Sequence, residues 1–408
     1  MAKIAVLGYG TVGSGVVEVL STNSSSIATR AGQPVEVKSV LDIRDFPGDP
    51  IQGKIVHDID DIVNDPEIDV VVEVMGGVEP AFTFVKKALD AGKSVCTSNK
   101  ALVAAHGPEL LEMAKERKLN FMFEASVGGG IPIIRPLNQS LTADEITKIT
   151  GILNGTTNYI LTKMSKEGSS YEETLKEAQE LGYAERNPEA DVEGYDACRK
   201  IAILTSLAYG STVNFEEVTT EGISKISIAD FKYAEKLGCV VKLLATSYRK
   251  DGKVYVITAP FMIDSTHPLY NVNDVLNGIY VNGNVLGNVM FFGAGAGKLP
   301  TASAVVADVV DCVKHKGTNV MTVWAKTKLE LGKTDDEVRE FFVRIKGDAS
   351  KDADAVKAAF GDVSVITVDG IEGEFGFVTG EMTEKAFNEA AKKFSVINRI
   401  RIDKTILK

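Results

Sequence analysis

The segment AQELGYAERNPEADVEGYDACRK collects several carboxylates and ends on a lysine at helical spacing. If a helix begins near Gly194, Asp196 and Lys200 are four residues apart and lie on one face, where the carboxylate can orient the ammonium. Such pairs are usually exposed and contribute roughly a few tenths of a kcal/mol. Here an apolar run follows at once, and Asn-Pro and Gly turns would hold Glu185 and Asp191 in place. The pattern favours a pocket for an amino acid with a side-chain alcohol, in which Lys200 exchanges a proton with the hydroxyl.

A second lysine, Lys100, follows the apolar run SVC within TSNKAL. It would lie at the carboxyl edge of a parallel sheet, where open α/β folds bind ligands. A cation there would lower the pKa of Lys200 and help it to act as an acid or base. On position alone, Lys100 is also compatible with a surface lysine at the end of a strand, which is the less favoured interpretation.

The run GYGTVG follows the first apolar strand and opens a helical pattern. In this context GxGxxG predicts a dinucleotide site, because the glycines allow a tight turn, close approach of a pyrophosphate and close helix packing. The helix N-terminus would offer unpaired amides to the phosphates. The residues expected at the cofactor are Gly8, Gly10, Thr11, Val12 and Gly13.

The choice between NAD and NADP stays open at the end of the second predicted strand. Asp42 could accept a hydrogen bond from a ribose hydroxyl, whereas Arg44 could face a 2′-phosphate.

The elements that position these residues fall into three parts. Non-alternating apolar runs separated by helical patterns predict a Rossmann-type α/β domain over residues 1–130, with a parallel sheet covered on both faces. Helices mixed with antiparallel strands predict an α+β catalytic and dimerisation domain over 131–324, whose helix at about 301–316 is expected to pack back on the first domain. A linker over 325–337 precedes a β-α-β-β-α-β unit of ferredoxin-like order at 338–408.

Composition narrows the classes of partner. A net charge of −11 over 408 residues argues against a nucleic-acid surface, and no run of about 20 apolar residues predicts a membrane span. No signal-peptide pattern opens the chain, and its four cysteines form no CxxC pair, so we expect a cytoplasmic protein. The expected partner is a small molecule, within a homodimer or homotetramer that buries one face of the second sheet.

The spaced residues of the opening segment closely resemble the signature of homoserine dehydrogenases. The blocks GYGTVGSG, VVVEVMGG, TSNKALVA, FEASVGGGIP and GILNGTTNYIL resemble that family in the same order, over roughly residues 1–320. The resemblance implies NAD(P)-dependent interconversion of L-homoserine and L-aspartate 4-semialdehyde, on the route to threonine, methionine and isoleucine.

The resemblance also implies a role for each matching residue. Lys200 would be the proton donor and acceptor, and Lys100 would lie between the nicotinamide and the substrate. The substrate would be bound by Glu185, Asp191, Asp196, Gly155 and Thr156. Further cofactor contacts would come from Arg44, Met75, Gly76, Thr97, Ser98, Lys100 and Gly297.

A glycine-rich turn at 124–132, EASVGGGIP, exposes backbone carbonyls, which are ligands for hard cations. The resemblance implies a structural sodium ion bound by backbone oxygens of Glu124, Val127, Gly129 and Ile131. Read from the residues alone, the segment is also compatible with a plain flexible turn.

The C-terminal unit resembles an ACT domain, a regulatory module found on longer homoserine dehydrogenases. Typical members carry Asp-x-Pro-Gly after the first strand, whereas this chain has Gly347, Asp348 and Ala349 there. The unit therefore predicts either a threonine-binding sensor or a module used for oligomer contacts.

Two other functions are compatible with parts of the sequence. One is aldehyde oxidation through a cysteine adduct at Cys96 or Cys198, which needs a nearby base that no histidine motif supplies. The other is a non-catalytic dinucleotide sensor, which the presence of Lys200 disfavours.

Overall fold

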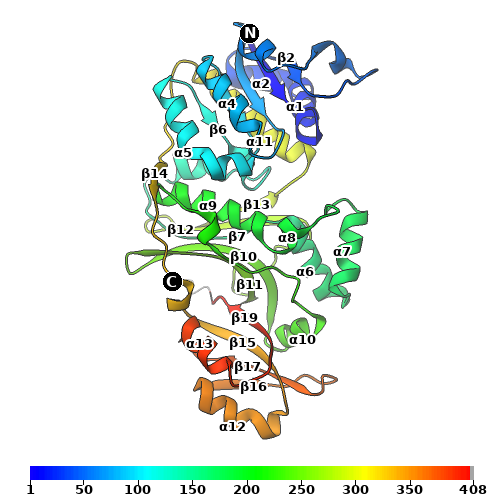
Figure 1. The fold of residues 1–408 in the computed structure, drawn as a ribbon, viewed down its shortest axis with the longest axis vertical. Coiled ribbons are helices and arrows are strands. Elements are labelled where there is room, and N and C mark those ends of the chain that lie inside the picture. Colours follow the sequence, from blue (N-terminus) through cyan, green and yellow to red (C-terminus); the bar gives the residue numbers. More distant parts are fainter. Residues whose placement is uncertain (405–408) are drawn as a thin grey trace.

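Residues 1–404 are described by the computed structural model, in which three parts follow one another along the long axis (Figure 1). A parallel sheet with its helices occupies the N-terminal end. A large mixed sheet fills the middle and continues into the C-terminal end. None of the helices in the described part of the chain is long and apolar enough to span a bilayer.

The N-terminal sheet has the strand order β3-β2-β1-β4-β5-β6, with all neighbours parallel. Its strands are β1 (Ala2–Leu7), β2 (Val35–Leu41), β3 (Ile55–Val56), β4 (Ile68–Glu73), β5 (Ser94–Thr97) and β6 (Phe121–Met122). Its helices are α1 (Thr11–Thr22), α2 (Ser24–Ala31), α3 (Asp60–Val63), α4 (Ala81–Asp90), α5 (Lys100–Glu116) and α11 (Lys298–Lys314). This is the predicted doubly wound fold.

Strand β1 shows why its apolar run does not alternate with polar residues. Ile4 and Val6 belong to the core that includes α1, α2 and α11, whereas Ala5 and Leu7 belong to the core that includes α4 and α5. All four side chains are buried. Helices therefore cover both faces of the sheet, and α11 packs against α1 although the two helices are far apart in the sequence.

The middle part is built on β7 (Ile146–Ile152), β10 (Cys239–Lys250), β11 (Lys253–Asp264), β12 (Leu276–Gly283) and β13 (Gly287–Ala294). These strands pair antiparallel in the order β13-β12-β7-β10-β11. Short strands β8 (Ser211–Thr212) and β9 (Thr219–Thr220) lie outside this order. The helices are α6 (Gly155–Glu167), α7 (Tyr171–Glu180), α8 (Glu189–Val192), α9 (Tyr195–Tyr209) and α10 (Ile228–Lys236). Helix α9 packs on β7, β10 and β11.

The C-terminal part follows the predicted β-α-β-β-α-β order. Its elements are β15 (Val338–Lys346), α12 (Ala349–Phe360), β16 (Val363–Ile366), β17 (Glu374–Thr379), the short β18 (Met382–Thr383), α13 (Glu384–Ala391) and β19 (Val396–Ile402). The strand order β19-β15-β17-β16 is that of a ferredoxin-like unit. Strand β19 also pairs parallel with β11, so one sheet crosses from the middle part into the C-terminal part.

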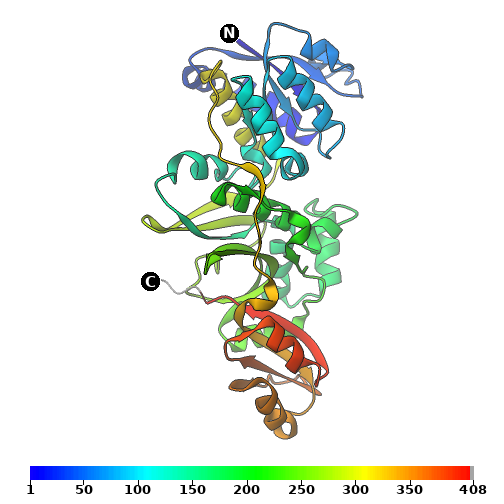
Figure 2. The same cartoon turned by 60° about the vertical axis from the view of Figure 1, so that its left-hand side comes forward.

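The segment expected to be a linker is partly ordered as secondary structure. It contains β14 (Ala325–Lys328), which pairs with β8, and a short 3-10 turn at Thr334–Asp336. Figure 2 shows the chain after α11, including this segment, running along the side of the middle part to the C-terminal part.

Candidate active site

A cleft of about 340 Å³ opens where the N-terminal and middle parts meet. Lys100 enters it from the start of α5, and Asp196 and Lys200 enter it from the first turns of α9. The remaining lining residues are Asn154, Gly155, Thr156, Gly182, Tyr183, Asp191, Val275, Ala294, Gly295, Ala296 and Gly297. Most substrate-site residues predicted from the sequence therefore share one cleft.

The centre of the cleft is one carboxylate between two lysines. Asp196 Oδ2 accepts a hydrogen bond from Lys200 Nζ at 2.6 Å, and its Oδ1 lies 2.5 Å from Lys100 Nζ. Lys200 Nζ also donates to the backbone oxygen of Leu153 at 2.8 Å. Asp196 is only 3% exposed, so the Asp196–Lys200 pair is buried, unlike most i,i+4 ion pairs on helices, which are solvent-exposed.

The two lysines keep Asp196 ionised. Burial alone would raise the pKa of Asp196, but the positive charges of Lys200 and Lys100 hold it well below its usual value. Burial likewise favours a lower pKa for Lys100, but the negative charge of Asp196 outweighs it and raises the pKa above its ordinary value. The carboxylate therefore holds Lys100 in its charged form at the cleft wall, next to Lys200.

Asn154 connects this centre to Asp191, and the sequence reasoning missed it. Its Nδ2 donates to Asp191 Oδ1 at 2.7 Å and to Asp196 Oδ2 at 2.9 Å, while its Oδ1 caps α6 by accepting from Thr157 N at 2.9 Å. Burial raises the pKa of Asp191. An asparagine directly before a helix in NGTTNY was the available signal, because asparagine is a favoured helix N-cap.

Glu185 does not line the cleft as the structure places it. It is exposed on the loop between α7 and α8, and its backbone oxygen accepts from the side chain of Gln179. Gly155 and Thr156 do line the cleft, and the Thr156 hydroxyl donates to the backbone oxygen of Tyr183 at 2.5 Å.

The glycine turn at the carboxyl end of β1 leaves room for a phosphate group. No heavy atom lies within 4 Å of the point that a Cβ on Gly10 would occupy, and no side chain caps the start of α1. The first turn of α1 carries no acidic residue, so its amides and its partial positive charge are available to an anion. These residues fit the pyrophosphate of a dinucleotide.

Gly13 is required by packing. A Cβ on Gly13 would lie 1.9 Å from the backbone oxygen of Gly8. We therefore expect Gly13→Ala to displace α1 and to weaken dinucleotide binding by at least roughly tenfold, measured by quenching of intrinsic fluorescence. Gly10→Ala is the matched variant, because a Cβ at Gly10 has space in the protein. This substitution should leave α1 in place and affect only the contact with a bound cofactor. Unchanged affinity in Gly13→Ala would contradict the packing argument.

Asp42 and Arg44, between which the choice of cofactor was left open, bind each other. Asp42 accepts from Tyr9 N at 2.8 Å and from Arg44 Nε and Nη2 at 2.9 Å each. The Arg44 side chain remains more than half exposed and lies over the Phe46 ring. Asp42 is thus an ionised partner of Arg44, whose guanidinium stays exposed on its outer side.

A buried glutamate orders the turns after β4 and β5. Glu73 accepts from the Thr97 hydroxyl at 2.6 Å and from Met75 N at 2.8 Å. Burial raises its pKa. Ser98 N donates to the backbone oxygen of Glu73 at 3.4 Å. Glu73 therefore binds the Thr97 hydroxyl and the amides of Met75 and Ser98 within the protein, at the edge of the sheet where the sequence predicted cofactor contacts.

The cysteines lie away from the cleft. Cys96 and Cys198 are buried, do not line the cleft, and burial raises the pKa of both thiols. A thiolate nucleophile would need the opposite shift. The structure therefore argues against the cysteine-adduct chemistry.

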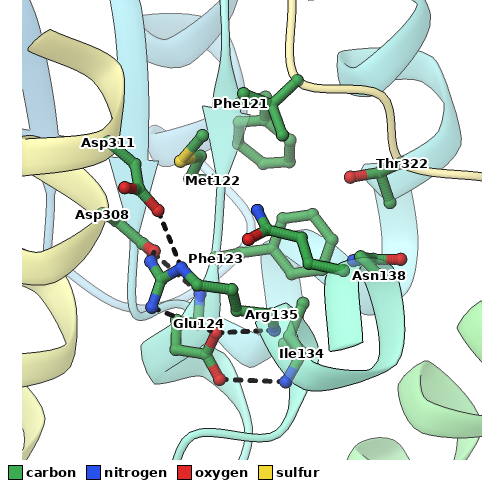
Figure 3. A pocket seen from close by; sticks show the side chains of 12 residues that line it. Phe121, Met122, Phe123, Glu124, Ile134, Arg135, Asn138, Asp308, Asp311 and Thr322 are labelled. Carbon is green, nitrogen blue, oxygen red and sulfur yellow. Dashed lines mark hydrogen bonds and ion pairs between the residues drawn. The ribbon is translucent and has the colours of Figure 1, made fainter. Parts of the chain in front are cut away.

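The segment proposed for sodium begins in a buried ionic cluster. Figure 3 shows Arg135 pointing toward Asp308 and Asp311 of α11, with the Glu124 carboxylate beside it. Arg135 donates to Asp308 at 2.6 Å and to Asp311 at 2.7 Å. Glu124 accepts from the backbone amides of Ile133, Ile134 and Arg135 at 2.6, 2.9 and 2.7 Å. Helix α11 is thereby joined to the start of the middle part.

This cluster predicts a pH-dependent stability. Burial, reinforced by the charge of Glu124, raises the pKa of Asp308 to about 8. Between its unfolded and folded pKa the native protein holds one more proton, so this contribution to stability is lost as the pH rises. Relative to Asp308→Asn, wild type should lose up to about 1.4 kcal/mol of unfolding free energy per pH unit between about pH 5 and pH 8. Denaturant titrations would measure the difference, and a constant difference would contradict the prediction.

The turn itself has oxygens to offer to a cation. Three backbone oxygens of the turn are without a loop-to-loop backbone hydrogen bond among the 404 described residues: those of Val127, Gly129 and Ile131. The backbone at Gly129 has φ 55°, and a Cβ there would lie 2.4 Å from the oxygen of Gly295. Among the same residues, no cluster of His, Cys, Asp and Glu side chains could hold a metal. The donors that fit sodium here are therefore carbonyls.

The fold and the cleft together are those of a dinucleotide-dependent oxidoreductase, with two lysines lining the cleft. Family models agree: "Homoserine dehydrogenase, NAD binding domain" matches residues 8–124, and "Homoserine dehydrogenase" matches residues 132–310. The chain belongs to the homoserine dehydrogenase family.

Individual relatives give the same result. The chain is 45% identical over 317 residues to a homoserine dehydrogenase of Bacillus subtilis, covering 77% of this chain and 73% of the relative. It is 47% identical over 319 residues to that of Synechocystis, covering 76% and 73%. A solved homoserine dehydrogenase from Thiobacillus denitrificans superposes with a TM-score of 0.92 at 34% identity, covering 99% of this chain and 98% of that one. One described as a hyperthermophilic archaeal homoserine dehydrogenase in complex with NADPH has a TM-score of 0.65 at 30% identity and covers 76% and 97%.

Proposed function

We propose that the cleft interconverts L-homoserine and L-aspartate 4-semialdehyde, with Lys200 as the acid and base at the substrate oxygen. The observation that carries this proposal is Asp196, which binds Lys200 and Lys100 through its two oxygens. A bound nicotinamide would supply the hydride acceptor or donor. Lys200 would take the hydroxyl proton during oxidation and return it during reduction, and Lys100 would stabilise the developing negative charge on oxygen.

The polar groups of the opposite wall suit the amino-acid end of the substrate. Asp191 and Asp196 supply negative charge for an ammonium group, and the N-terminus of α6 at Gly155 and Thr156 supplies amides for a carboxylate. Glu185 would join them if the loop between α7 and α8 closed over the substrate.

The proposed reaction is tested by following NAD(P)H absorbance with homoserine as the substrate. Turnover that requires both homoserine and the dinucleotide is expected. Absence of turnover with both NAD and NADP would overturn the proposal. It would favour the dinucleotide sensor, which family membership and the lysine pair both disfavour.

We propose that NADP is accepted as readily as NAD. Asp42 is already neutralised by Arg44, whose exposed guanidinium can bind a 2′-phosphate. The NADPH bound to the archaeal relative supports the same assignment. Arg44→Ala should raise the KM for NADP and leave the KM for NAD nearly unchanged.

We further propose the three-domain division at 1–130, 131–324 and 338–408, with a structural sodium ion held by the backbone oxygens of Glu124, Val127, Gly129 and Ile131. Family membership supports a role in threonine, methionine and isoleucine synthesis in the cytoplasm. The exposed edge strand β13, with Phe292 more than half exposed, supports a homodimer or homotetramer. Light scattering tests the assembly.

The C-terminal unit is proposed to be an ACT-like domain on the basis of its strand order. Its loop after β15 lacks the Pro-Gly turn, and Asp348 instead caps α12 by accepting from Ser350 N at 2.9 Å. A titration with L-threonine decides between a sensor and an oligomer module. If L-threonine causes neither inhibition nor a shift of the thermal midpoint, the sensor hypothesis is wrong.

A further inference from the structure

Among the 404 described residues, a buried lysine outside the proposed catalytic centre binds neutral oxygens and no carboxylate. Lys242 of β10 is 2% exposed, and its Nζ donates to the backbone oxygen of Val272 at 2.5 Å, to Asn273 Oδ1 at 3.0 Å and to Asn158 Oδ1 at 3.2 Å. Buried ammonium groups are normally paired with carboxylates. Burial lowers the pKa of Lys242 to about 8, which leaves the group protonated at neutral pH. Lys242 therefore binds these oxygens much as a bound cation would.

Two of these oxygens, those of Val272 and Asn273, belong to a loop that α6 also holds. Asn158 of α6 is 1% exposed, and its Nδ2 donates to the backbone oxygens of Asp274 and Leu276 at 3.0 Å each. The backbone amide of Asp274 donates to the Thr162 hydroxyl at 3.1 Å. Loop 272–276 is thus tied to α6 along its length, and Lys242 secures its first two residues from the sheet side.

This loop forms part of the cleft wall. Val275 lines the cleft together with Gly155, the first residue of α6. The two backbones touch, since a Cβ on Gly155 would lie 2.7 Å from the oxygen of Val275. Any displacement of the loop would therefore change the space beside the N-terminus of α6.

We propose that Lys242 is a positioning residue whose ammonium acts as a built-in cation, fixing loop 272–276 against α6 and so setting the width of the substrate end of the cleft. The proposal rests on the proposed function, because that function assigns this end of the cleft to the amino-acid substrate. Lys242 itself does not line the cleft.

The test compares Lys242→Met with Lys93→Met in the full-length protein. Lys93 is a matched control: it is 3% exposed, and its Nζ donates to the backbone oxygens of Asp65 and Ile68 at 2.6 and 3.0 Å, but it lies in the N-terminal part away from the cleft. Lys242→Met should raise the KM for homoserine on the order of tenfold, while kcat and the KM for the dinucleotide change by less than about threefold. Lys93→Met should lower the thermal midpoint without changing the KM for homoserine.

An unchanged KM for homoserine in a folded Lys242→Met variant would overturn the proposal, as would an equal rise in Lys93→Met. If Lys242→Met does not fold, Thr162→Val loosens the same loop, since it removes the acceptor for Asp274 N, and it should raise the same KM by a few-fold. The homoserine assay on the wild-type protein distinguishes failure of the proposed function from failure of the Lys242 proposal. Lack of homoserine turnover in wild type defeats the proposed function, whereas normal turnover with an insensitive KM defeats only the role of Lys242.

Discussion

Lys200→Met should reduce kcat for homoserine oxidation by roughly 10²- to 10⁴-fold, the usual contribution of a positioned acid or base. Lys200 reaches into the cleft from α9 and is held by Asp196 at 2.6 Å and by the oxygen of Leu153 at 2.8 Å. Methionine keeps most of the length and the apolar packing of the side chain but cannot carry the proton. Dinucleotide affinity should be unchanged, because the glycine turn is untouched. Steady-state kinetics and a fluorescence titration measure the two effects.

Lys163→Met is the control for this variant. Lys163 forms an i,i+4 pair with Glu167 at 2.9 Å, with the same spacing as Lys200 and Asp196, but it lies outside the cleft on α6. Its kcat should match wild type. A Lys200→Met enzyme that retains full kcat would show that another group moves the proton.

Asp196→Asn should lower kcat/KM for homoserine by at least roughly 100-fold, because it removes the one carboxylate that both lysines share. Burial would then lower the pKa of Lys100 without the opposing charge of Asp196. The basic limb of the pH profile should consequently move to lower pH. Asparagine preserves the shape of the side chain, so a change in the pH profile reports the lost charge rather than a cavity.

A second buried aspartate provides the comparison for Asp196→Asn. Asp230 is 0% exposed and accepts from Arg344 Nη1 at 2.8 Å, far from the cleft in the contact between α10 and β15. Asp230→Asn should lower the unfolding free energy, because it leaves Arg344 less well compensated. It should leave the pH profile of kcat unchanged. If the two variants shift the profile alike, the shift does not originate at Lys100 and Lys200.

Much of this site could be predicted from local sequence. The spacing of Asp196 and Lys200 fixes their common face once α9 begins, and α9 begins directly after Gly194, as expected. Lys100 follows a parallel strand, whose end must lie at the ligand edge of the sheet. These inferences succeed because helical periodicity and parallel topology are short-range rules.

Other features depend on contacts between distant segments, which local patterns do not report. Asn154 reaches Asp191 across 37 residues, and Lys242 reaches Val272 across 30. The pairing of β14 with β8 turned an expected linker into a strand, although its sequence has no apolar alternation and its residues stay exposed. Glu185 was predicted in the pocket by resemblance, yet its loop places it at the surface.

The parallel pairing of β19 with β11 bears on how the chain can be shortened. Phe261 and Met262 of β11 lie opposite Arg401 and Ile402 of β19. A chain cut after residue 337 would leave those backbone groups of β11 without their partners, and it would uncover the fully buried Phe261. Open strand edges with apolar side chains recruit other chains. Truncation for crystallisation or expression would therefore favour aggregation unless polar substitutions protect that edge.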